Sequence, residues 1–169
     1  MKLNKIKLSL ATLALMAMGT NLSALTETSS FTVTTTVVGS CNIDSSANMA
    51  FADYANGASS VDVSSTSDIT VNCSNGTPYS IGLDAGNGSS STVTTRKMGN
   101  TNGTGTDTIN YSLSLDSSGN NWGNTVNTDT VDKTGNGAAQ ISKVYGKITA
   151  GQSPEIGSYT DTINVLVTY

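Results

Sequence analysis

Apolar and polar residues alternate along most of this chain, most clearly in its last eleven residues, YTDTINVLVTY (159–169). A period of two in β-preferring residues is typical of a strand with one buried face. The apolar phase consists of Ile163, Val165, Val167 and Tyr169. No later strand follows in the sequence, so we expect the outer edge of this strand to need a partner from elsewhere.

A second alternating segment, FTVTTTVVGS (31–40), lies near the other end of the chain. We expect its more apolar phase to be buried, because the other phase is threonine except for one valine and would remove less apolar surface from water. The more apolar phase consists of Phe31, Val33, Thr35 and Val37. The segment is either the first strand of its own domain or a strand donated to a neighbour, and spacing alone does not separate these two interpretations.

Short alternating segments separated by glycine, asparagine and serine fill the middle of the chain. Together with frequent turn signals such as Asn75-Gly76, they predict an all-β sandwich. Trp122 stands alone in a polar stretch, where a tryptophan more often covers the edge of a core than stacks on a sugar. The expected strands lie at 49–54, 61–63, 68–73, 79–83, 92–98, 109–115 and 140–148.

The first 24 residues have the form of a secretory signal peptide. Lys2, Lys5 and Lys7 precede an apolar run at 8–18 that is too short to span a bilayer. Cleavage after Ala24 leaves about 145 residues, enough for one domain. All 12 acidic residues, but only five of the eight basic ones, lie in this mature part. An acidic surface without basic clusters argues against nucleic acid and anionic membranes as partners.

Cys41 and Cys73 are the only cysteines. In an exported chain such a pair predicts a disulfide, whose loop of roughly 33 residues contributes about 3.7 kcal/mol in the chain-entropy model. A metal site is the poorer interpretation, because the chain has no histidine. The lack of histidine also argues against a nucleophilic triad.

A pair of catalytic carboxylates is the remaining enzymatic alternative. The candidates lie at turns or strand ends, where solvated or capping carboxylates are ordinary. They are Asp84, Asp107, Asp116 and Asp161. We therefore expect no catalytic residue, no metal and no cofactor, and we do not expect an enzyme.

The C-terminal block, preceded by VYGKITAGQ (144–152) and Gly157-Ser158, resembles the C-terminal signature of the spore coat protein U domain family. This family contains the subunits of archaic, Csu-type chaperone–usher pili. Departures at Ala52, Ser114, Lys147 and Thr149 concern the branch of the family and leave the fold assignment intact. The resemblance extends through INYSLSLD (109–116) with Trp122, RKM (96–98), ITVNCSNGTPYSIGLDAG (69–86), FADY (51–54) and FTVTTTVVGSC (31–41).

This resemblance implies an incomplete immunoglobulin-like β-sandwich that is completed by a donor strand from a neighbouring subunit. Residues 25–40 would be the donor extension and 41–169 the pilin domain. Phe31, Val33, Thr35 and Val37 would enter a neighbour's groove, and the apolar phase of the last strand would line the groove of its own subunit. That lining is Ile163, Val165, Val167 and Tyr169.

The function implied is that of a structural subunit of a surface fimbria, exported through the periplasm, that supports adhesion and biofilm formation. Its partners would be identical or related pilin subunits, a periplasmic chaperone and an outer-membrane usher, with no nucleic acid and no membrane span. Two alternatives stay open: a secreted carbohydrate- or surface-binding adhesin module, and a coat protein that completes its own fold.

Overall fold

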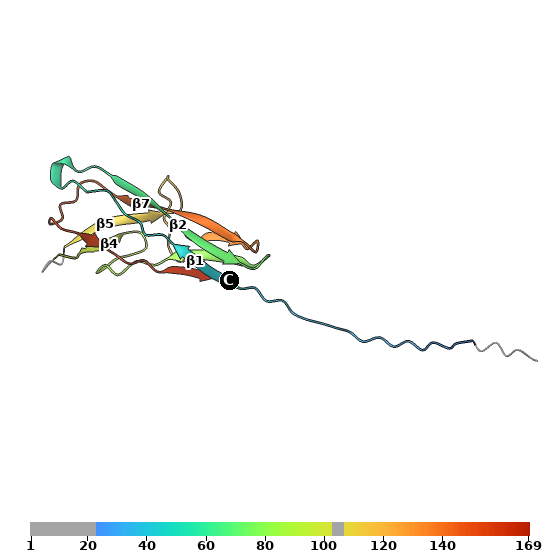
Figure 1. The fold of residues 1–169 in the computed structure, drawn as a ribbon. Coiled ribbons are helices and arrows are strands. Elements are labelled where there is room, and N and C mark those ends of the chain that lie inside the picture. Colours follow the sequence, from blue (N-terminus) through green and yellow to red (C-terminus); the bar gives the residue numbers. More distant parts are fainter. Residues whose placement is uncertain (1–22, 103–106) are drawn as a thin grey trace, which may run out of the picture. The chain divides into compact units, whose positions relative to one another are not determined.

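The computed structural model describes residues 23–102 and 107–169. The predicted signal peptide therefore lies outside the described residues, apart from Ser23 and Ala24. The described chain divides into an N-terminal segment that ends at Thr36 and a compact unit from Val37 to Tyr169 (Figure 1). Residues 23–40 form no helix or strand.

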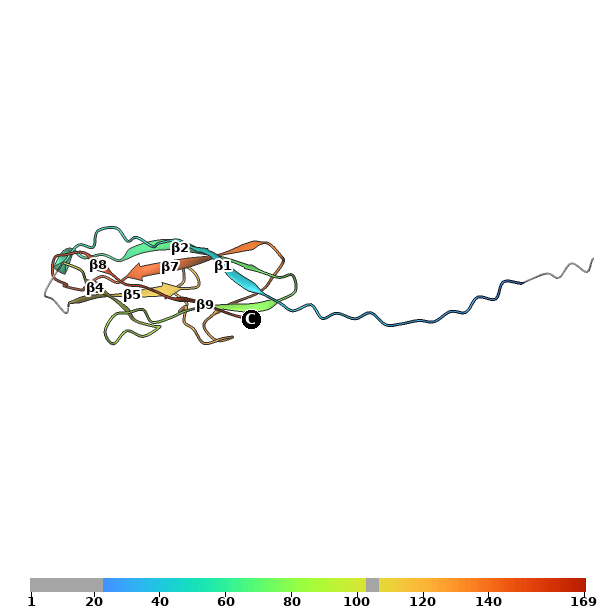
Figure 2. The same ribbon diagram turned by 60° about the horizontal axis from the view of Figure 1, so that its bottom comes forward.

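Two antiparallel sheets make up the compact unit, seen from two sides in Figures 1 and 2. The larger sheet has the strand order β1-β2-β7-β5-β4-β8, and the smaller has the order β6-β3-β9. One short 3-10 turn, η1, precedes β2. The elements are β1 (Cys41–Ser46), η1 (Gly57–Ser59), β2 (Val63–Cys73), β3 (Pro78–Leu83), β4 (Arg96–Asn100), β5 (Thr108–Ser114), β6 (Val131–Thr134), β7 (Ala139–Ile148), β8 (Tyr159–Thr160) and β9 (Val165–Thr168).

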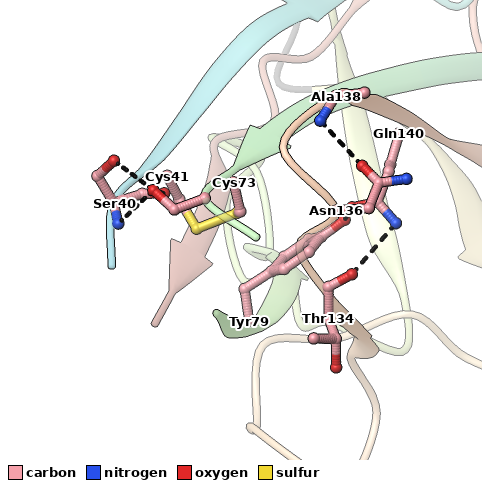
Figure 3. Close-up of a disulfide and its surroundings, with 9 residues drawn as sticks. Ser40, Cys41, Cys73, Tyr79, Thr134, Asn136, Ala138 and Gln140 are labelled. Atoms are coloured by element: carbon pink, nitrogen blue, oxygen red, sulfur yellow. Dashed lines mark hydrogen bonds between the residues drawn. A yellow bond between two sulfur atoms is a disulfide. The ribbon is translucent and has the colours of Figure 1, made fainter. Parts of the chain in front are cut away.

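The predicted disulfide is confirmed. Cys41 and Cys73 are direct partners in the β1–β2 ladder, with Cα atoms 4.1 Å apart, and their sulfur atoms are bonded (Figure 3). Beside them, the main-chain N–H of Ser74 donates to the carbonyl of Ser40 at 2.9 Å. The disulfide and this hydrogen bond thus fix the start of β1 to the end of β2.

The strand predicted at 49–54 is wrong. This segment runs beside β2, but serine side chains replace the main-chain ladder: Ser65 donates to the carbonyl of Ala50 at 2.6 Å, and Ser67 donates to that of Ala47. Gly146 on β7 makes room for the segment, since a Cβ there would lie 2.2 Å from the sulfur of Met49. The segment is therefore held over the larger sheet without being a strand of it.

The continuous strand predicted at 159–169 is also divided in the structure. β8 pairs with β4 in the larger sheet, β9 pairs with β3 in the smaller one, and residues 161–164 cross between them. The alternation nevertheless persists through the crossing. Asp161 and Ile163 are half-buried, and Thr160, Thr162 and Asn164 are exposed.

The hydrophobic core lies between the sheets. Trp122 is fully buried in it, as predicted for a tryptophan that covers the core, and its indole N–H donates to the carbonyl of Ile81 at 2.8 Å. No helix within 23–102 and 107–169 is long and apolar enough to cross a membrane. The other buried apolar residues are Ile69, Val71, Cys73, Tyr79, Ile81, Leu83, Ile109, Tyr111, Leu113, Val144 and Ile148.

Candidate functional site

A groove of about 650 Å³, the open groove below, runs along one side of the sandwich. One wall comes from the segment 46–51 that follows β1, and the other from residues 159–165. Its floor consists of side chains from β2, β3, β4, β5 and β7, which are mostly members of the core. They are Ser67, Ile69, Leu83, Met98, Tyr111, Leu113 and Val144. The open groove is therefore a place where the core reaches the surface between two neighbouring segments.

Side chains on the 159–165 wall are less covered than their neighbours on β3. Leu83 is 1% exposed, whereas Val165, its partner across the ladder, is only half-buried. Both side chains contact the same core, so the difference lies in what covers the outer side of the last strand. That outer side is the open groove.

The main chain of this wall is also unpaired on its groove side. The N–H of Asp84 donates to the carbonyl of Asn164 at 3.2 Å, which directs the main-chain groups of Asn164 toward β3. In an antiparallel ladder the next residues direct theirs to the opposite side, so Ile163 and Val165 present N–H and C=O groups away from β3. Within the described part of the chain, no strand pairs with this side of β9. The open groove thus combines an apolar floor with an unused strand edge.

Asp161 fixes the crossing between β8 and β9. Its carboxylate accepts hydrogen bonds from the hydroxyl of Tyr111 at 2.7 Å and from the main-chain N–H groups of Asn87 at 2.8 Å and Thr162 at 2.7 Å. Burial, together with this bond to Asp161, raises the pKa of Tyr111 well above its ordinary value. Tyr111 therefore stays protonated and donates to the carboxylate.

Asp84 holds the other end of the crossing. Its carboxylate accepts from the main-chain N–H of Asn164 at 3.0 Å and from that of Gly86 at 3.0 Å. Gly86 has a φ of +77°, and a Cβ at this position would lie 2.2 Å from the carboxylate of Asp161. Two carboxylates and one glycine thus bind the crossing tightly. They also replace part of the ladder in the interrupted strand.

Opposite this wall, Phe51 packs edge-on against the ring of Tyr111 with ring centroids 6.2 Å apart. Tyr111 therefore touches one wall through its ring and the other through its hydroxyl. The two walls are held apart by a rigid aromatic floor at this point. The open groove therefore lies between the edge of the last strand and the 46–51 segment.

A buried arginine on β4 lies beside Tyr111, its partner in the β4–β5 ladder. Arg96 is fully buried, and its guanidinium donates to four main-chain carbonyls at 2.7–3.0 Å. Burial lowers its pKa, while the nearby Tyr111, Asp84, Asp161 and Asp129 act in the opposite direction. The four acceptors are the carbonyls of Asp84, Val93, Leu83 and Trp122.

The N-terminal segment carries the predicted donor residues. Phe31, Val33 and Val37 are 88%, 82% and 89% exposed, and Thr35 is exposed as well. Every residue from 23 to 40 is exposed, so exposure does not select one phase over the other. The donor role and its phase stay predictions.

The structure separates the four residues predicted for the groove. Ile163 and Val165 line the open groove, whereas Val167 lies on β9 beyond it and Tyr169 is 64% exposed beside Val37. Sequence reasoning did not assign Tyr159 and Asp161 to this lining, although they share the phase of Ile163. It also missed the opposite wall, where only the apolar Met49 and Phe51 gave a signal.

No group of three or more metal-binding side chains comes together within residues 23–102 and 107–169. The open groove itself offers apolar side chains for burial and main-chain groups for pairing.

The sequence profile of the Spore Coat Protein U domain matches residues 27–166. The chain belongs to this family. The Spore Coat Protein U match covers both the open groove and the exposed segment 31–37, and it confirms the family resemblance seen in the sequence. No curated protein sequence matches the chain.

Two solved structures are similar to this Spore Coat Protein U domain, and the first of them agrees with an immunoglobulin-like, all-β fold. The first is the CsuC–CsuE chaperone–tip adhesion subunit pre-assembly complex from archaic chaperone–usher Csu pili of Acinetobacter baumannii. It is 22% identical with a TM-score of 0.54, and the alignment covers 79% of this chain and 41% of that one. The second, a chaperone–tip adhesin complex of CFA/I fimbriae biogenesis, is 14% identical with a TM-score of 0.40, over 77% and 41% of the two chains. The fold conclusion rests on the first of the two.

Proposed function

We propose that this chain is a structural subunit of a surface fimbria assembled by the chaperone–usher pathway. Neighbouring subunits join by donor-strand complementation, in which residues 31–37 of one copy occupy the open groove of the next. The observation that carries the proposal is the open groove itself, an apolar floor beside the unpaired edge of β9. The exposed alternating segment supplies a strand of matching pattern.

Burial of apolar side chains accounts for the affinity. Fully burying one valine or phenylalanine stabilises by about 1.5–3 kcal/mol, and Phe31, Val33 and Val37 are all exposed before assembly. Main-chain pairing with the groove-side edge of Ile163 and Val165 adds affinity that does not depend on side-chain identity. A strand that satisfies both requirements would complete the sandwich.

A periplasmic chaperone would cover the open groove before assembly, and an outer-membrane usher would exchange it for the donor segment of the next subunit. The Csu structure similar to this chain is a chaperone–subunit complex, which supports the chaperone step. The finished fibre would lie at the cell surface and support adhesion and biofilm formation. Assembly needs no chemical fuel if the donor segment buries more apolar surface than the chaperone does.

The test compares fibres on cells that express the chain with its chaperone and usher. Deleting 26–37 should leave chaperone binding intact and abolish fibres in negative-stain electron micrographs. Val33→Asp should also abolish them, because a charge cannot be buried in an apolar groove without a partner. The matched control, Thr34→Asp, changes the other phase and should leave fibres unchanged. Normal fibres from the deletion or from Val33→Asp would contradict the proposal.

A further inference from the structure

The open groove carries one polar position among its inward-facing apolar ones. Between β9 and β8 the wall presents four residues of the half-buried phase. Read from the β9 end, the first two are apolar, the third is a carboxylate and the fourth is a tyrosine. They are Val165, Ile163, Asp161 and Tyr159.

The donor segment has the same order of side chains. Read from its N-terminal end, its more apolar phase begins with two apolar residues, has a threonine third and ends with a valine. These residues are Phe31, Val33, Thr35 and Val37. Four positions on the wall and four on the segment therefore share the pattern apolar, apolar, polar and partly or fully apolar.

We propose that the donor segment of a second copy binds antiparallel to residues 159–165, with the hydroxyl of Thr35 hydrogen-bonded to the carboxylate of Asp161. The inference rests on the proposed function and assigns its register, with Asp161 as the specificity-determining residue. The facing pairs are Phe31 with Val165, Val33 with Ile163, Thr35 with Asp161 and Val37 with Tyr159.

Asp161 has capacity for this bond. A carboxylate offers about four acceptor positions, and Asp161 uses three of them: two on Oδ1, for Asn87 and Thr162, and one on Oδ2, for Tyr111. Oδ2 can therefore accept a further donor. A threonine hydroxyl donates one hydrogen, and a bond to a charged acceptor is stronger than one between neutral groups.

Other registers leave this carboxylate facing a hydrocarbon. An antiparallel shift of two residues in either direction places Val33 or Val37 against Asp161. The Thr35 hydroxyl then faces an aliphatic or aromatic side chain in place of the carboxylate. A parallel strand that keeps Thr35 at Asp161 moves Phe31 past Tyr159 and out of the four positions. Polar groups buried without a partner are costly, so the antiparallel register is selected against these alternatives.

The direction also fits the course of the chain. The wall 159–165 runs from the β8 end of the sandwich toward the β9 end, near which β1 begins (Figure 2). A segment antiparallel to this wall leaves the open groove at the β8 end, where the body of the donating copy would follow. Successive copies would then be joined end to end, with Val37 to Ser40 as the connection to the next β1.

Paired cysteines read the register directly. Residues directly opposite on antiparallel strands lie about 4.5–5.5 Å apart at Cα, whereas positions two residues away lie about 7–8 Å apart, beyond the reach of a disulfide. Three full-chain variants are assembled into fibres and oxidised: Val33→Cys with Ile163→Cys, Phe31→Cys with Ile163→Cys, and Val33→Cys with Val165→Cys. Only the first should give a covalent ladder on a non-reducing gel, with the Val33–Ile163 link identified by peptide mapping.

A ladder from either shifted pair, or fibres in which none of the three pairs is linked, would overturn the register while leaving the proposed function intact. If none of the variants, nor the unmodified chain, forms fibres, the proposed function itself fails. The two failures are therefore distinguishable in one experiment.

The hydroxyl is tested separately with Thr35→Val. A groove that recognises only apolar surface should hold valine more tightly than threonine. Loss of a hydrogen bond to a charged group should instead make fibres dissociate about tenfold faster in denaturant. Thr35→Ser should restore the rate, and Thr34→Val, in the opposite phase, should leave it unchanged. Equal or slower dissociation of the Thr35→Val fibres would overturn the role of Asp161.

Discussion

Two parts of the molecule cover the same core to different extents. On what we call the closed side, the side chains of Trp122 and Arg96 are fully buried, and the carbonyls that face the guanidinium are hydrogen-bonded. On the other side the core reaches the open groove, and Ile163 and Val165 are only half-buried. The closed side is completed by a loop of the same chain. The open side is an apolar groove beside the edge strand β9.

The polar groups of the two sides show the same contrast. Arg96 brings a charge into the core with four hydrogen bonds to main-chain carbonyls, which costs little only while the four carbonyls stay in place. The open side instead leaves main-chain groups of β9 facing the open groove. The closed side is therefore self-sufficient, and the open side is complementary to an extended chain.

The largest expected effect is on the closed side. Arg96→Met removes four hydrogen bonds to main-chain carbonyls, and we expect a loss of at least about 4 kcal/mol in the free energy of unfolding. The neighbouring Lys97→Met is the control and should change it by less than about 1 kcal/mol. Denaturant unfolding of the chaperone-free chain measures both. Equal stability of the two variants would show that the closed side does not depend on this arginine.

The next effect concerns the entrance to the open side. Replacing both Cys41 and Cys73 by serine should cost about 2–4 kcal/mol, because the loop between them is freed in the unfolded chain. The disulfide also fixes the start of β1, which leads into the groove wall 46–51. Thermal unfolding before and after reduction measures the effect on the native chain. An unchanged melting temperature on reduction would contradict it.

A matched pair of valines compares the two sides directly. Val71 is fully buried, so Val71→Ala should cost about 2 kcal/mol in any state of the chain. Val165→Ala should cost about 0.5 kcal/mol in the free chain and approach 2 kcal/mol once a donor strand covers the open groove. Unfolding of free and strand-completed forms gives all four values. A cost for Val165→Ala that is the same in both forms would remove the distinction between the sides.

The smallest expected effect is on pH dependence at the β8 end of the open groove. Hydrogen bonds to its carboxylate lower the pKa of Asp107. The largest effect comes from the main-chain N–H of Glu155, followed by the N–H of Thr108 and the hydroxyl of Tyr159. A lowered pKa in the folded state gives stability that is present above the ordinary pKa and is lost as pH falls through the folded value, so the loss occurs below about pH 4. Asp107→Asn should flatten this part of the stability curve, and the exposed Asp53→Asn should not.

Several strands could be predicted because one face of each contacts the core. In β5 and at the end of β2, apolar residues recur at every second position and burial follows the same period. In β3 five consecutive residues are buried, and in β7 the buried phase includes Ser142 while Ile141 is exposed. β1 has one apolar residue, Ile43, in its interior and is defined instead by its ladder with β2. The 49–54 segment has strand-like residues, but serine hydroxyls take the place of ladder bonds.

The site was predictable in part for the same reason. The phase of Ile163 and Val165 follows from local alternation, whereas the ends of the open groove depend on where the other wall stops. Arg96 left no sequence signal, because its acceptors are main-chain carbonyls whose side chains are irrelevant to the contact. Pattern thus predicts which face of a strand is buried. It does not predict what completes the burial.

The central claim is that residues 31–37 complete the sandwich by occupying the open groove. The most direct measurement moves 26–37 from the N-terminus to a position after Tyr169, through a flexible linker long enough for the segment to return along β9. Thermal unfolding of this single chain is compared with that of the same chain carrying Val33→Asp. The account predicts a monomer whose melting temperature exceeds that of the Val33→Asp form by about 10 °C or more. If the two melt alike, or if the deletion alone is already an equally stable monomer, the account is contradicted.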